Sequence, residues 1–175
     1  MKKTLLMAAV AAALMISCKE DYSFCLSDAV ILSDSRESPE VYDTALSLRG
    51  DITAVTGKPA PKSHRKTIIM GTVGRSQYIR RMADAGLIDV SDIKGVPGQY
   101  LIQKVDDRTF VVAGSDVIGL ACGAKHLGER IGVNQFDPDA PVVHRRKAIV
   151  DGTRYVSNAA SNKYLELVLP EGEYN

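Results

Sequence analysis

Residues 109–134 read TFVVAGSDVIGLACGAKHLGERIGVN, and they contain a strand, a turn and a helix in direct succession. The run from Thr109 to Ala113 is apolar and predicts a buried strand. Ser115 and Asp116 are typical helix N-caps, and Gly132 is typical of a left-handed helix end. Between them the apolar residues recur every three or four positions, which predicts one buried stripe of Val117, Leu120, Ala121, Ala124, Leu127 and Ile131.

The same alternation of strand and helix extends toward the N-terminus. The expected elements are a strand at 29–32, a helix from Pro39 to Gly57 with Ser38 as N-cap, a strand at 67–70, a helix at about 76–85, and a hairpin of 99–105 with 109–113. On the last helix Lys125 and Glu129 are four residues apart and are expected to pair. The order β-α-β-α-β-β-α predicts an α/β fold of the two-layer α+β kind, a small mixed sheet with helices packed on it.

The first residues have the composition of a secretory signal. Lys2 and Lys3 precede an apolar run of 12 residues, 5–16, which is shorter than the roughly 20 needed to span a bilayer. Met15-Ile16-Ser17-Cys18 resembles a bacterial lipobox, although a typical one has Leu at the position of Met15. Lys19-Glu20-Asp21 resembles the charged export signal of Bacteroidota outer-membrane lipoproteins.

This resemblance implies that residues 1–17 are removed and that Cys18 carries a lipid, with residues 18–28 as a polar tether. The membrane partner is then lipid through Cys18, and the chain is exported and anchored to the outer membrane. It would face the cell surface or, alternatively, the periplasm. An ordinary cleaved secretory signal with an incidental cysteine is the other interpretation.

The remaining 158 residues are enough for one domain, expected at 29–150, with one core. Loss of Lys2 and Lys3 leaves 20 basic against 21 acidic residues, a balance that implies no nucleic-acid partner. Cys25 and Cys122 are too few to indicate a disulfide framework, and Cys122, in an apolar helix, is expected to be a buried thiol.

Two glycine-containing loops stand before helices, where backbone amides can bind anions. The first, Gly71 to Ser76, lacks both the lysine of a phosphate loop and the third glycine of a dinucleotide site, so a tight turn explains it better. The second contains Ser115 and Asp116, which are the candidate ligand contacts of this chain. N-capping is the stronger explanation for both, because their oxygens satisfy free amides of the first helical turn.

No catalytic, cofactor or metal site is predicted. His64, His126 and His144 are far apart in sequence and have no metal-ligand spacing with another His or Cys. Asp137 and Asp139 flank a proline and are typical turn formers rather than the paired carboxylates of a glycosidase.

The chain from about residue 29 to 164 resembles the N-terminal domain of glycoside hydrolase family 115, whose members remove glucuronic acid from xylan. The matching segments are Val55-Thr56-Gly57-Lys58, 71–76, Ala113-Gly114-Ser115-Asp116, Gly119, Gly123, Arg130-Ile131-Gly132-Val133, 140–147 and Ser161-Asn162-Lys163-Tyr164. The related domains of hexosaminidases and other α-glucuronidases imply a chitobiase/hexosaminidase domain-2-like fold. In that family the catalytic machinery lies on a barrel after this domain, so residues 151–175 are expected to be an unpaired extension toward an absent barrel.

The sequence departs from the family at functionally important positions. Val117 and Ile118 replace basic residues, the chain has no Trp, and no barrel carboxylate is present. The first hypothesis is therefore a non-catalytic N-terminal domain, a fragment of an α-glucuronidase acting on glucuronoxylan and inactive alone. The second is a stand-alone surface lipoprotein that binds glycan or assembles proteins. The implied partners are a xylan-type glycan or a catalytic barrel domain. An independent small enzyme is a third, disfavoured reading, because no nucleophile–base or metal constellation appears.

Overall fold

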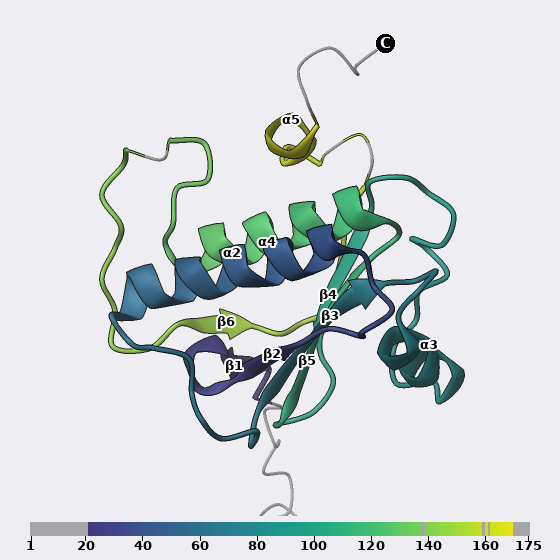
Figure 1. The fold of residues 1–175 in the computed structure, drawn as a ribbon, viewed down its shortest axis with the longest axis horizontal. Helices are drawn as coiled ribbons and strands as arrows, with labels where there is room; N and C mark the ends of the chain where they lie inside the picture. Colours follow the sequence, from purple (N-terminus) through teal and green to yellow (C-terminus); the bar gives the residue numbers. More distant parts are fainter. Residues whose placement is uncertain (1–20, 138, 159, 161, 170–175) are drawn as a thin grey trace, which may run out of the picture.

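A five-stranded mixed sheet forms the centre of the molecule in a computed structural model, which describes residues 21–137, 139–158, 160 and 162–169 (Figure 1). Its strands, in spatial order, are β2 (Val30–Leu32), β3 (Thr67–Thr72), β5 (Thr109–Gly114), β4 (Tyr100–Lys104) and β7 (Tyr155–Val156). The first three run parallel, whereas β4 is antiparallel to both β5 and β7. The expected mixed sheet and the expected hairpin are therefore confirmed.

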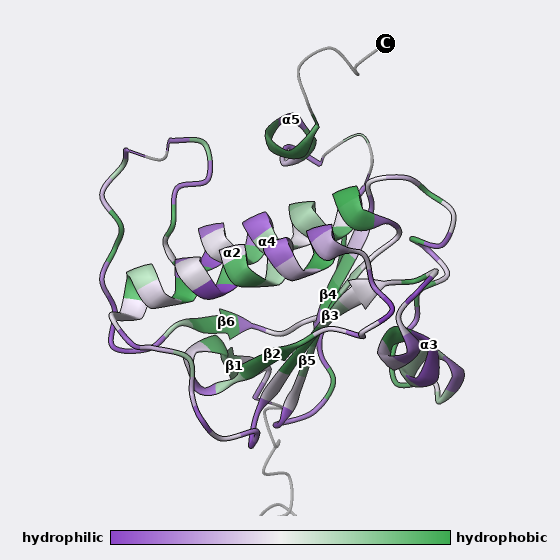
Figure 2. Ribbon diagram, in the orientation of Figure 1, coloured by the Kyte–Doolittle hydropathy of each residue, from purple (hydrophilic) through white to green (hydrophobic). Residues whose placement is uncertain are grey.

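Helices pack on both faces of this sheet. On one face α2 (Pro39–Thr56) and α4 (Val117–Ile131) lie side by side, and on the other is α3 (Gln77–Asp84) (Figure 1). Figure 2 shows the apolar side of α3 turned toward the sheet. Four successive residues of β5, Phe110 to Ala113, are fully buried, as expected for a central strand covered on both sides. The expectation of two layers is thus incomplete, because α3 adds a third.

Glycines permit the close packing of α4 that the sequence predicts. A Cβ on Gly119 would collide with the backbone carbonyl of Gln99, and one on Gly123 would lie 2.9 Å from Cγ1 of Val112. Gly57 and Gly132 end α2 and α4 with φ of 64° and 111°, which glycine adopts at little cost. Ser38 precedes α2 as expected, although its side chain makes no capping hydrogen bond.

The N-terminal part of the domain differs from the expected tether. β1 (Ser23–Cys25) pairs antiparallel with β6 (Ile149–Asp151), and the turn η1 (Leu26–Asp28) follows it. Phe24 and Leu26 are buried in the main core. The prediction of a polar tether is therefore wrong from Ser23 onward, because these apolar side chains add to the core and their backbone pairs with a distant strand. Cys18 and the expected signal peptide lie outside the described residues.

The C-terminal extension is also part of the domain. β7 pairs with β4, Ser157 N donates to Tyr100 O at 2.9 Å, and Tyr164 is only 3% exposed. The short helix α5 (Leu165–Val168) packs on the same core through its apolar residues (Figure 1). The expectation of an unpaired extension is therefore wrong for residues 155–169. Glu129 pairs with Lys163 at 2.7 Å, not with Lys125 as predicted, because the extension brings a second lysine to it.

Within the described part of the chain, none of the helices combines the length and the apolar character that crossing a membrane requires.

Candidate functional site

The two glycine-containing loops meet in one cleft at the carboxyl ends of β3 and β5. Such edges are where open α/β sheets place their ligands. The cleft has a volume of about 640 Å³ and is lined by Ser38, Glu40, Thr72, Gly74, Arg75, Ser115, Asp116 and Val117. The loops touch directly, since Val73 N donates to Gly114 O at 2.9 Å. Two motifs that are about 40 residues apart in sequence therefore form a single site.

Both predicted contact residues line this cleft, but their oxygens are engaged by backbone amides. The Asp116 carboxylate accepts from Gly119 N at 2.7 Å and from Gly98 N at 3.0 Å. Ser115 Oγ accepts from Gln99 N at 3.1 Å. The predicted N-cap role is confirmed for Asp116 and is wrong for Ser115, whose hydroxyl binds the amide of Gln99 and not one of α4. Ligand contact by either residue stays a prediction. The pair also fixes residues 98–99 against the start of α4.

Glu37 is a buried carboxylate behind the first loop that the sequence analysis missed. It is 7% exposed, and it accepts from Thr72 N at 2.6 Å and from Thr72 Oγ1 at 2.9 Å. The sequence contained one signal for this role, because Glu37 lies shortly after strand β2. Residues that follow one parallel strand lie at the same edge of the sheet as residues that follow the neighbouring parallel strands.

Asp34 holds the other end of the same loop and was also missed. Its carboxylate forms an ion pair with Arg36 at 2.8 Å and accepts from Gln77 N, the first amide of α3, at 2.7 Å. These hydrogen bonds, those from Arg36 above all, hold the pKa of Asp34 well below its usual range. The loop from Thr72 to Gln77 is thus fixed at both ends by buried acidic side chains, and Ser76 Oγ caps α3 through Ile79 N at 3.3 Å.

Among the described residues, the carboxylates that line the cleft belong to Glu40 and Asp116. Cleavage takes two carboxyl groups facing the bond from opposite sides, one of them free to exchange a proton. The two oxygens of Asp116 are occupied by backbone amides, and Glu40 lies exposed at the rim. Arg75 is likewise exposed at the rim, on the loop between β3 and α3. The rim therefore offers one exposed guanidinium, Arg75, which suits an anionic group, and near it one exposed carboxylate, Glu40.

His126 belongs to a separate cluster that fixes the C-terminal extension. Its Nε2 accepts from Arg130 Nε at 3.0 Å, so Nδ1 carries the proton and donates to the Tyr100 hydroxyl at 3.0 Å. Burial, with the nearby Arg130, lowers the pKa of His126 to about 4. Tyr164 stacks on the imidazole at 5.4 Å and donates to Glu129. These contacts hold the extension on α4.

The remaining nucleophilic and metal-ligating side chains are dispersed. Burial raises the pKa of the Cys122 thiol to about 11, which agrees with the predicted inert buried cysteine. Asp139 N donates to Asp137 Oδ1 at 3.1 Å, the turn role expected of Asp137. Across residues 21–169, the masked positions aside, no three His, Cys, Asp or Glu side chains gather as metal ligands would.

Comparison with known proteins identifies the fold. No protein-family model matches the chain, and no curated protein matches it. A solved structure that it resembles is a family GH115 4-O-methyl-α-glucuronidase with specificity for decorated arabinogalactans, with a TM-score of 0.61, 24% sequence identity and coverage of 79% of this chain. The likeness shows that the two proteins share a fold over most of this chain. The chain spans 18% of the length of that enzyme, so the shared fold corresponds to one part of it.

Proposed function

We propose that the chain is the non-catalytic N-terminal domain of a GH115-like α-glucuronidase system that acts on glucuronoxylan. The observation that carries this proposal is the likeness of 79% of the chain to a segment of a glucuronidase. We further propose that the protein is exported and held at the outer membrane by lipid on Cys18, facing the cell surface. At the cell surface the protein would be able to contact an insoluble polysaccharide outside the cell.

The cleft supports a binding role within this proposal. Uronic acid side groups carry a carboxylate, and Arg75 is the exposed guanidinium at the rim. Asp34, Glu37 and Asp116 hold the cleft in shape through backbone amides rather than facing a ligand. A domain built in this way would orient a uronate-bearing chain, or a neighbouring barrel, without cleaving a bond.

The test is an assay of glucuronic acid release by the purified mature chain. We expect no release above a buffer control from glucuronoxylan or from decorated arabinogalactan, whereas a complete α-glucuronidase in the same assay releases it. Release that persists through stringent purification would contradict the non-catalytic role. The variants Asp137→Asn and Asp139→Asn would then show whether that turn supplies the activity.

A second function, a stand-alone glycan-binding or assembly lipoprotein, is favoured by one observation. β7 pairs with this domain's own sheet edge, and Tyr164 with α5 packs on its core, whereas a linker to a barrel would not need such contacts. Affinity electrophoresis of the chain in glucuronoxylan separates the two functions. Retardation without any added enzyme supports the binding module if Arg75→Ala reduces it and the exposed control Arg80→Ala does not. Unchanged mobility supports a domain that acts only beside a barrel.

A further inference from the structure

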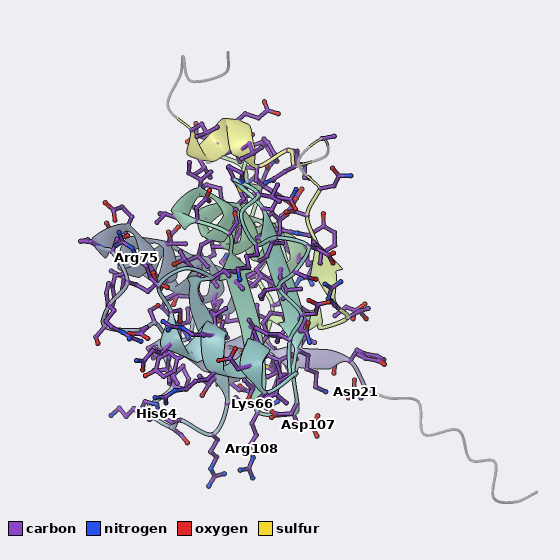
Figure 3. All side chains as sticks on the ribbon, turned by 90° about the vertical axis from the view of Figure 1, so that its right-hand side faces the viewer. Asp21, His64, Lys66, Arg75, Asp107 and Arg108 are labelled. Carbon is purple, nitrogen blue, oxygen red and sulfur yellow. The ribbon has the colours of Figure 1, made fainter. Side chains whose placement is uncertain are left out.

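The end of the molecule opposite the cleft carries cations that form no ion pair with another described residue. They lie at the amino ends of β3 and β5, where the two preceding loops lie side by side and Thr67 N donates to Arg108 O at 2.7 Å. A hollow of about 660 Å³ lies between them, lined by His64, Arg65, Lys66, Thr67, Asp107, Arg108 and Thr109. Figure 3 shows His64, Lys66 and Arg108 gathered at this end, far from Arg75. We call Arg65, Lys66 and Arg108 the cationic end.

The charges of the cationic end are available to a partner. Among the described residues, Arg65, Lys66 and Arg108 form no ion pair. The nearby acid Asp107 is bound to Lys104 at 2.8 Å, and Asp106 accepts from the backbone N–H of Arg108 at 2.7 Å. Arg65 and Arg108 are exposed, whereas Lys66 is half-buried, and the acids Asp21, Asp106 and Asp107 at the same end are exposed as well. Counted with Lys104, the four cations of this end exceed its three acids by one, and the two exposed arginines are the charges most accessible to a partner.

The N-terminal strand emerges at this same end. Lys104 Nζ donates to the carbonyl of Asp21, the first described residue, and Lys66 Nζ lies 5.1 Å above the ring of Phe24 (Figure 3). Cys18 is three residues before Asp21, and three residues reach at most about 11 Å in any conformation. A lipid on Cys18 would therefore hold Asp21 within about 11 Å of the anchored cysteine, a separation comparable to the Debye length of about 8–10 Å, and would turn this end of the molecule toward the bilayer.

We propose that the cationic end docks on the anionic headgroups of the bilayer that holds the Cys18 lipid. This inference rests on the lipid anchoring proposed above. Each exposed Lys or Arg near an anionic membrane strengthens binding by roughly fivefold, so the surface adds a second signal to the acyl anchor. Docking also fixes the orientation, because the cleft with Arg75 lies at the opposite ends of the same strands and faces away from the membrane.

The experiment uses the mature chain with Cys18→Ser, so that vesicle binding is measured without the lipid. We expect it to sediment with vesicles of phosphatidylglycerol and phosphatidylcholine, not with pure phosphatidylcholine, and to dissociate as salt is raised. Arg65→Glu with Arg108→Glu should weaken binding at least about 25-fold, since two cations are lost and reversed. Arg80→Glu with Lys94→Glu makes the same change of charge at exposed positions elsewhere and should leave binding unchanged.

Equal binding by the two double variants would overturn the proposal, as would binding to neutral vesicles or no binding by the parent chain. Competition by soluble glucuronoxylan at this surface would assign it to an acidic glycan and overturn the lipid partner. Circular dichroism and a milder pair, Arg65→Gln with Arg108→Gln, ensure that a loss reflects charge and not misfolding. Incorporation of labelled palmitate into the wild type tests Cys18 separately, so failure of the anchor and failure of the surface are distinguishable.

Discussion

The two ends of the parallel strands use charge in opposite ways. At the carboxyl end the acids Asp34, Glu37 and Asp116 are satisfied by backbone amides and shape the cleft. At the amino end Arg65 and Arg108 are exposed and form no ion pair among the described residues. Charges engaged inside the protein contribute to stability, whereas exposed ones contribute little to it and are available for binding. Substitutions at the first end should therefore unfold the protein, and those at the second should alter only its partners.

The largest effect is expected for Glu37→Ala. The change leaves Thr72 N and Thr72 Oγ1 buried without their acceptor, and hydrogen bonds to charged groups contribute about 1.5–3 kcal/mol each. We expect the free energy of unfolding, measured by urea denaturation, to fall by about 3 kcal/mol. Asp43→Ala, an exposed acid on α2, is the control and should change it by less than about 0.5 kcal/mol. Equal effects would show that Glu37 does not hold the loop.

Asp116→Ala should have the next largest effect, about 2 kcal/mol. Loss of an N-cap alone costs about 1 kcal/mol, and here the same carboxylate also binds Gly98 N. Asp116→Asn keeps one acceptor and should recover about half of the loss. The same urea titration measures both, and an Asp116→Asn variant as unstable as Asp116→Ala would contradict the capping role.

Local signals in the sequence predicted most helices and strands, whereas contacts between residues far apart in the sequence could not be predicted. The stretch 109–134 folds as expected because its strand, N-cap, apolar stripe and terminal glycine all lie within one continuous segment. Residues 23–28 were missed because β1 has three residues and pairs with a strand more than 120 positions later. Tyr155–Val156 was missed for the same reason, since a strand of two residues has no periodicity of its own.

The candidate site was likewise predictable only where its signals are local in the sequence. Asp116 as N-cap followed from its position before α4, and Ser115 and Asp116 line the cleft, while their contact with a ligand stays a prediction. Asp34 and Glu37 could not be assigned a role, because the amides that they bind belong to a loop at least 35 residues further along the chain. The aromatic cluster around His126 was invisible for the same reason, since Tyr100, Tyr155 and Tyr164 come from three separate segments.

The half-buried His126 sharpens the comparison through pH. The pKa of His126 is about 4 in the folded protein and about 6.5 when unfolded, so between these values the unfolded chain binds more protons. Stability should therefore fall as the pH drops from 6.5 to 4 and then level off for this group. We expect a loss of about 1.5 kcal/mol, because solvent partly screens the ring.

His126→Gln should flatten this part of the profile, because the group whose pKa is lowered by folding is then absent. Thermal unfolding followed at several pH values measures the slope for the parent and for the variant. A parent profile with no slope between pH 6.5 and 4 would show that the imidazole is open to solvent, and the C-terminal extension would then not be held by it.

The smallest effect on stability is expected for the charge reversals at the cationic end. Arg65→Glu with Arg108→Glu removes no ion pair within the described residues, and surface substitutions of this kind usually change the free energy of unfolding by less than about 0.5 kcal/mol. The same pair should nevertheless weaken binding to anionic vesicles at least about 25-fold. A large loss in the urea titration would mean that these cations stabilise the loops through Asp106 and Asp107, as the acids of the cleft stabilise theirs. The two ends would then use charge in the same way, and the membrane surface would have to be sought elsewhere on the molecule.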